Sequence, residues 1–208
     1  GIVHLHMHTA WALRAAVATC CATQASVVDA TLQVQHHYRS LRVRTGSGPG
    51  VLTPSQQVSL HDITPQLRTF IADSGVSEGS LNLISQHTTT ALTINEMETR
   101  LVDDVSEWLL RLAPPALPYK HNDLHLRPAS AEDEARIDRN WMSQGKGTLE
   151  EFMAQEPINA HSHLLAMLLG ASQTIPISSG ELCLGAWQSV ILVELDGPRE
   201  RTVGAQIV

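Results

Sequence analysis

The sequence has little cysteine, little positive charge and no long apolar run, and each shortage excludes a class of protein. Its three cysteines are Cys20, Cys21 and Cys183. Two of them are adjacent and the count is odd, which argues against a disulfide framework and favours a reducing compartment. The net charge of −7 disfavours a nucleic-acid partner, because nucleic acids are bound by a basic face. No apolar run approaches the roughly 20 residues that cross a bilayer, so we expect no membrane segment.

Acidic residues are missing from the start of the chain, where Asp29 is the first. We interpret residues 1–30 as a leader that is either disordered or transit-like, since organelle transit peptides lack acidic residues. The expected location is cytoplasmic, with an organelle matrix or stroma as the alternative if residues 1–28 are a transit remnant. Residues 31–208 are numerous enough for one domain that buries roughly 70% of its unfolded surface.

Alternating apolar and polar residues predict the strands. The predicted strands cover residues 31–45, 56–64, 80–86, 172–177, 182–195 and 201–208. The segment DGPR (196–199) has the composition of a tight turn, so we expect it to join the last two strands.

Helical spacing indicates three helices. Thr64 and Pro65 offer an N-cap and a first-turn proline, and Gly75 can end that helix in the left-handed region. The second helix has one face that we expect to lie in the core, formed by Leu101, Val105, Trp108 and Leu112. The third covers residues 159–170.

Residues 129–157 are rich in charge, and we interpret them as an excursion from the domain. Strands and helices otherwise follow one another without a regular β–α–β alternation. This mixture predicts a single compact α+β domain with a mixed or antiparallel sheet and a few packed helices.

Four blocks occur in order between about Val58 and the C-terminus: GVSEGSLNLISQHTTTALTINE, YKHND, NAHSHLLAMLLGASQTIPI and GELCLGAWQSVILVELDGPRERTV. They resemble the YjbQ-like family, also called the secondary thiamine-phosphate synthase family. The last block departs from the family pattern at Ala186, where the family has threonine. Residues 126–157 are longer than the usual connection, and residues 1–30 lie outside the resemblance. The resemblance implies a compact α+β protein that forms homotrimers and has weak thiamine-phosphate synthase activity.

The same blocks single out His87, His121 and His163 as candidate metal ligands. They come from a strand end, a loop and a helix. Three imidazoles would leave the fourth position of a divalent ion such as Zn²⁺ open, and Lewis-acid chemistry needs an open position. The alternative is that they are hydrogen-bonding histidines at the edge of the core. Because residues i and i+2 of a helix point to nearly opposite sides, only one of His161 and His163 should be a ligand.

Glu96 and the threonines before it form a polar segment with two interpretations. Glu96 is a general acid or base beside the metal, or an orienter of a ligand imidazole. Alternatively, Thr93 and Glu96 form a capping box at the start of the next helix. Thr88 and Thr89 offer hydroxyls and backbone N–H groups that favour an anion such as phosphate, or they form only a turn.

Four further polar residues are candidates for substrate contacts. The planar guanidinium of Arg199 suits phosphate, and Asp196 either pairs with it or forms an Asx-turn. Asn159 either orients a ligand or caps the third helix. Ser172 is a minor anion contact, and the amide of Gln188 must find hydrogen-bond partners among apolar neighbours.

Together these residues predict a metal-binding enzyme that acts on a small phosphorylated molecule. In the thiamine-phosphate synthase reaction that the resemblance implies, diphosphate leaves a pyrimidine methylene and a thiazole nitrogen attacks. The metal and Arg199 would stabilise the departing charge, and Glu96 would position or transfer a proton. One alternative is a metal-dependent hydrolase whose metal-bound water is the nucleophile. The other is a non-enzymatic trimeric protein with a structural ion or none.

Overall fold

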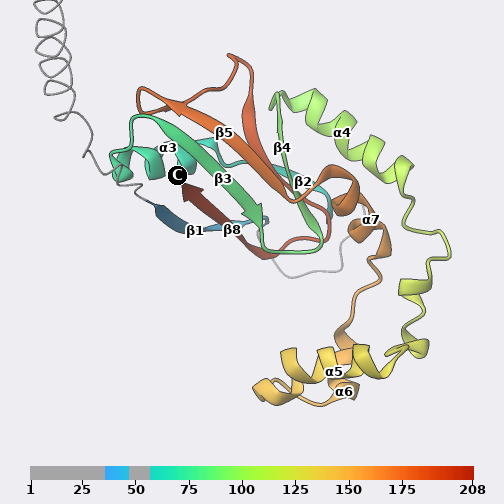
Figure 1. Cartoon of the computed structure of the whole chain (residues 1–208). Helices are drawn as coiled ribbons and strands as arrows, with labels where there is room; N and C mark the ends of the chain where they lie inside the picture. Colours follow the sequence, from blue (N-terminus) through green and yellow to red (C-terminus); the bar gives the residue numbers. More distant parts are fainter. Residues whose placement is uncertain (1–35, 47–56) are drawn as a thin grey trace, which may run out of the picture. The chain divides into compact units, whose positions relative to one another are not determined.

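The computed structural model describes residues 36–46 and 57–208, and its strands form two antiparallel sheets (Figure 1). The leader predicted at residues 1–30 lies outside the described residues. The larger sheet has the order β1 (His37–Arg44), β8 (Glu200–Ile207), β3 (Gly79–Ser85), β5 (Ser172–Ser178) and β6 (Glu181–Leu182). The smaller sheet has the order β2 (Ser59–Asp62), β7 (Ser189–Glu194) and β4 (Thr90–Asn95).

Helices accompany the sheets without a regular alternation, which confirms the α+β fold. They are α3 (Thr64–Ser74), α4 (Thr99–Leu112), α5 (Ala131–Asn140), α6 (Leu149–Gln155) and α7 (Ala160–Leu169). Short 3₁₀ turns occur at η1 (Lys120–Asn122), η2 (Leu124–Leu126) and η3 (Met142–Gln144). Within the described ranges, none of the helices is both long and apolar enough to cross a bilayer.

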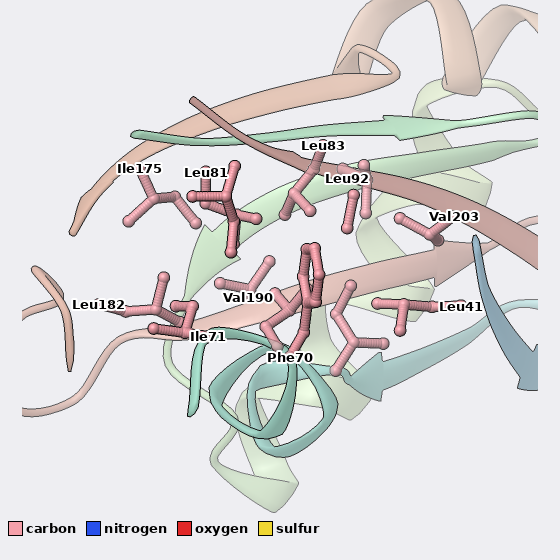
Figure 2. Close-up of a cluster of buried hydrophobic side chains, with 14 of the residues drawn as sticks. Leu41, Phe70, Ile71, Leu81, Leu83, Leu92, Ile175, Leu182, Val190 and Val203 are labelled. Atoms are coloured by element: carbon pink, nitrogen blue, oxygen red, sulfur yellow. The ribbon is translucent and has the colours of Figure 1, made fainter. Parts of the chain in front are cut away.

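The main core lies between α3 and apolar side chains of both sheets (Figure 2). The α3 residues Leu67, Phe70 and Ile71 are buried, as their spacing predicts. Figure 2 shows the α3 side chains facing residues of both sheets, among them Leu41, Leu81, Leu83, Leu92, Ile175, Val190 and Val203. Burying one such side chain fully contributes about 1.5–3 kcal/mol, so this cluster is the main apolar contribution to stability.

The ends of α3 match the sequence in part. Gly75 ends the helix with φ of 70°, in the left-handed region, as predicted. Thr64, however, is not the N-cap. Its backbone N–H donates to Asp62 Oδ1 at 2.8 Å, and its Oγ1 accepts from the N–H of Val190 at 2.9 Å. The hydroxyl therefore ties the helix to β7.

The prediction for α4 is wrong at its start and on its core face. Thr93 lies inside β4, because that strand pairs with β7 as far as Asn95, so no capping box forms there. Glu98 caps the helix instead. Its carboxylate accepts from the N–H groups of Arg100 and Leu101 in the first turn of α4. Leu109 is fully buried, whereas Trp108 and Leu112 are 49% and 48% exposed. The buried face is therefore rotated from the predicted one.

The single strand predicted at 182–195 is two strands, β6 and β7. Between them, Gln188 closes a tight turn: its N–H donates to the carbonyl of Gly185, and its Oε1 accepts from the N–H of Gly185 at 2.7 Å. Trp187, inside this turn, is 77% exposed. The apolar run of β7 therefore begins only after the turn.

Candidate functional site

Strand pairing brings two chain turns and the end of β1 together. Thr90, the first residue of β4, pairs with Glu194, the last residue of β7. The turn 86–89 before β4 therefore adjoins the turn 195–199 that joins β7 to β8. The N–H of Thr45, just past the end of β1, donates to the carbonyl of Arg199, which brings the end of the β1–β8 ladder of the larger sheet to the same turn.

A buried ion pair forms the base of this region. The Arg201 guanidinium donates from Nε to Glu194 Oε2 and from Nη2 to Glu194 Oε1, both at 2.6 Å. Thr45 Oγ1 also donates to Glu194 Oε2 at 2.8 Å, and Thr89 Oγ1 accepts from Arg201 Nη2 at 3.1 Å. Because these bonds are short, charge-assisted and bidentate, they give this layer a defined geometry.

The Glu194 carboxylate stays ionised despite its burial. Burial raises the pKa of Glu194, but the hydrogen bonds from Arg201, the Asp196 N–H and Thr45, with the charge of Arg201, outweigh it and lower the pKa below the ordinary carboxyl range. The pair therefore carries both charges at neutral pH. With its oxygens occupied by protein donors, Glu194 is a positioning group.

Above this layer, Asp196 holds Arg199 at the surface. Arg199 donates from Nη2 to Asp196 Oδ2 at 2.9 Å and from Nε to the Asp196 carbonyl at 3.0 Å, which confirms the predicted pair. Asn159 Nδ2 donates to the same Asp196 oxygen at 2.8 Å. The Asp196 side chain is buried, whereas that of Arg199 is 48% exposed. Asp196 therefore orients the Arg199 guanidinium from its buried side, and the exposed side is open to solvent.

His87 follows β3, as its place after the strand predicts, and its ring orientation is determined by one hydrogen bond. Its Nε2 accepts from the backbone N–H of Thr202 at 2.8 Å. A neutral imidazole with an accepting Nε2 carries its proton on Nδ1. Burial, followed by the charges of Arg201 and Arg199, lowers the pKa of His87, and Glu194 only partly opposes them. His87 is thus a neutral ring that presents an N–H donor.

His163 lies beside His121, with ring centroids 4.9 Å apart and planes at 72°. The N–H of Ala160, at the start of α7, donates to Asn122 Oδ1 at 3.1 Å and holds η1 against the helix. This contact explains why residues 42 positions apart in the sequence meet.

Burial lowers the pKa of His163, and His121 lowers it further. Asp196, Glu156 and a hydrogen bond to the Thr88 backbone raise the pKa, but less than these two effects lower it. The lowered pKa keeps the His163 ring neutral, and a neutral imidazole has one N–H and one lone pair. His163 can therefore accept a proton at one ring nitrogen.

His161 lies on the other side of α7 and is 1% exposed. Its Nε2 lies 3.3 Å from Ser162 Oγ, which in turn donates to the carbonyl of Leu195 at 2.6 Å. Burial lowers the pKa of His161 as well. His161 therefore belongs to the interior layer, and His163 is the surface histidine of the helix.

The structure does not bring every candidate residue to this site. The strand β4, roughly 20 Å long, separates Glu96 from His87. Gln188 lies at the opposite end of β7 from Glu194 and closes its own turn. Ser172, by contrast, begins β5 opposite Ile84, three residues before His87, so it is exposed at the strand end nearest the site.

Thr88, Thr89 and Asn159 have different structural roles. Thr88 is exposed at the site, whereas Thr89 is buried and holds Arg201. Asn159 makes no capping hydrogen bond to α7, so it orients Asp196 instead.

The predicted zinc ligands do not meet within one chain. Among residues 36–46 and 57–208, no three or more His, Cys, Asp or Glu side chains are placed to share an ion. His121 and His163 adjoin, but His87 uses Nε2 to accept from Thr202. The residues present do not fit the metal as predicted, so no chemical step is derived through it. The three-histidine ligand set stays a prediction.

Sequence reasoning missed the pair of Glu194 and Arg201. Its signal is a single carboxylate at the end of the apolar run VILVE, with an arginine on the other side of a four-residue turn. A lone charge in an apolar strand requires a partner. The arginine just after the following turn is close in the chain, although β7 and β8 belong to different sheets.

Comparisons with known proteins agree on one family. Residues 51–208 match the family model described as UPF0047 protein YjbQ-like. A UPF0047 protein from Methanothermobacter thermautotrophicus is 36% identical over 156 residues, which cover 75% of this chain and 87% of that protein. Another from Archaeoglobus fulgidus is 34% identical over 152 residues, covering 73% and 93%.

Solved structures show the same likeness. A protein from Sulfolobus solfataricus, described as YbjQ-like and of unknown function, is 29% identical with a TM-score of 0.61. The match covers 83% of this chain and 96% of that one. A hypothetical protein from Aeropyrum pernix is 30% identical with a TM-score of 0.60, covering 83% and 98%.

Proposed function

The chain belongs to the UPF0047 YjbQ-like family, and we propose that it is an enzyme acting on a small phosphorylated molecule at His87, His163 and Arg199. One observation carries the proposal. Two imidazoles with lowered pKa values, His87 after β3 and His163 on α7, accompany a half-exposed guanidinium that Asp196 orients.

Arg199 would bind the phosphate group. Its planar guanidinium matches the spacing of phosphate oxygens, and Asp196 orients it before the ligand arrives. The exposed hydroxyl of Thr88 offers a further donor nearby. Because these groups are held in place, little ordering entropy remains to be lost on binding.

The two histidines would divide the proton chemistry. The Nδ1–H of His87 donates to an oxygen on which negative charge develops. The bare nitrogen of His163 takes a proton from the attacking group. Since the pKa of His163 is lowered, its base form is present at neutral pH. A positioned acid or base of this kind contributes about 10²- to 10⁴-fold to a rate.

Two reactions are candidates, and they use the histidines differently. In the thiamine-phosphate synthase reaction, the C–O bond to diphosphate breaks, a C–N bond to the thiazole nitrogen forms, and His87 stabilises the leaving diphosphate. The thiazole nitrogen carries no proton, so His163 accepts none in this reaction. In a hydrolysis, His163 accepts the proton of an attacking water. Glu96, predicted to handle a proton, has no part in either proposal because it lies at the far end of β4.

The test is turnover by the purified full chain. We would supply a pyrimidine-methyl diphosphate with a thiazole phosphate, and separately a panel of phosphomonoesters in ¹⁸O-labelled water. His163→Asn should lower the rate of hydrolysis about 10²- to 10⁴-fold, because it removes the base. His36→Asn is the control, because His36 is exposed and precedes β1 at the strand's far end. Label in the product indicates hydrolysis, whereas phosphate binding without turnover would favour a non-enzymatic protein.

The homotrimer also remains a proposal. It is supported by the apolar surface of α7, where Leu164, Met167 and Leu168 are 46%, 81% and 62% exposed. A subunit interface would remove these side chains from water. Sedimentation equilibrium at micromolar concentration tests it, and a stable monomer would contradict it.

A further inference from the structure

The charged segment after α4 contains a pocket of about 490 Å³. It is bounded by η1, residues 127–129, α5 and α6. Its volume lies within the range of about 300–1,000 Å³ that is usual for small-molecule sites. The pocket is separate from Arg199, although His121 contributes to its wall.

Positive charge predominates in the wall. Lys120, Arg127 and Arg136 line the pocket, together with the single carboxylate of Asp133. Arg127 Nη1 lies 2.7 Å from Glu156, and both side chains are largely buried, so this cation is already neutralised. Arg136 Nη2 is 3.7 Å from Glu132 in an exposed pair, which is worth little. Lys120 and Arg136 are thus the cations left to attract an anion into a pocket of a chain with net charge −7.

Another part of the wall is apolar. Ile137 from α5 and Phe152 from α6 face the pocket. The Phe152 ring is held by Trp141, with centroids 5.6 Å apart and planes at 63°. A fixed aromatic surface in the same pocket as two cations fits a ligand with an aromatic ring and an anionic group.

We propose that this pocket binds an aromatic phosphate ester. Lys120 and Arg136 bind its phosphate, and its ring packs on Ile137 and Phe152. The site goes beyond the proposed function, because the ligand binds here whether or not His163 acts on it. His121 connects the two regions, since one ring lines the pocket and contacts His163.

The probe is phenyl phosphate, titrated into the full chain by calorimetry. Arg199→Gln is introduced first, so that the proposed phosphate site at the strand ends no longer contributes. One phenyl phosphate per chain should still bind. Adding Arg136→Gln should raise its Kd about tenfold or more, because it removes a charged hydrogen-bond donor. Arg139→Gln is the matched control: it is on the same helix, exposed and outside the pocket.

Three outcomes would overturn the proposal. The first is an equal Kd for Arg136→Gln and Arg139→Gln. The second is complete loss of phenyl phosphate binding in Arg199→Gln alone, which would place all binding at the strand ends. The third is equal affinity for inorganic phosphate and phenyl phosphate, which would show that the apolar wall takes no part. None of these results depends on turnover, so failure here is distinguishable from failure of the proposed enzyme.

Discussion

Arg201, in β8 of the larger sheet, donates two hydrogen bonds of 2.6 Å to Glu194, the last residue of β7 in the smaller sheet, and both side chains are buried. A residue one or two positions after each of them contacts the candidate site. The N–H of Thr202, next to Arg201, orients His87. Asp196, two residues after Glu194, orients Arg199. The buried pair therefore sets the positions of both surface groups.

Arg201→Met should destabilise the fold by about 3–5 kcal/mol, because it leaves the Glu194 carboxylate buried without its cation. Urea unfolding followed by circular dichroism measures this change. Arg42→Met is the matched control. Arg42 also pairs with a glutamate, Glu200, but both side chains are mostly exposed. Such a pair contributes roughly 0–1 kcal/mol, so equal losses in the two variants would contradict the structure.

His163 should titrate below the ordinary histidine pKa of about 6.5, because burial and then His121 lower its pKa. NMR titration of the imidazole C–H resonances measures the midpoint directly. His121→Asn should move the midpoint upward by part of the difference, since burial remains. A midpoint that did not move would remove His121 as a cause.

The sign for stability follows from the same shift. Below about pH 6.5 the unfolded chain binds more protons at His163 than the folded chain, so stability is full above that pH and is lost as the pH falls toward the folded pKa. His87 and His161, whose pKa values are also lowered, should act in the same direction. Urea unfolding at pH 7.5 and pH 5.5 tests this expectation, and greater stability at pH 5.5 would refute it.

His87→Gln should leave the metal content of the purified protein unchanged, because Nε2 of His87 accepts a hydrogen bond from Thr202. Elemental analysis of both proteins, after dialysis against zinc and removal of free metal, provides the measurement. His163→Gln is the comparison, since the neutral ring of His163 has a lone pair that can bind zinc. Loss of zinc in His87→Gln would identify His87 as a ligand.

Leu109→Ala should cost about 2–5 kcal/mol, because the side chain is fully buried and its removal leaves a cavity. Leu112→Ala, three residues further along α4, should cost roughly 0.5 kcal/mol or less, because Leu112 is 48% exposed. Chemical unfolding of the two variants compares them on one helix. The reverse order would support the core face predicted from spacing and reject the observed one.

Local features were predictable where neighbouring residues decide them. The turn at DGPR, the end of α3 at Gly75, and the end of β3 before His87 depend on backbone preferences within a few residues. The start of α4 was not predictable in this way. Thr93 and Glu96 have the spacing of a capping box, but pairing between β4 and β7 keeps Thr93 extended, and Glu98 becomes the cap.

The α+β class and most strand positions can be read from the sequence, because they depend on composition and short-range periodicity, and the family can be read from its four motif blocks. Which polar groups meet is set by the folded arrangement. The pairing of Thr90 with Glu194 and the contact of Asn122 with Ala160 bring distant segments together. Register and packing are properties of the whole chain, so the side chains that surround His87 and His163 could not be identified from local patterns.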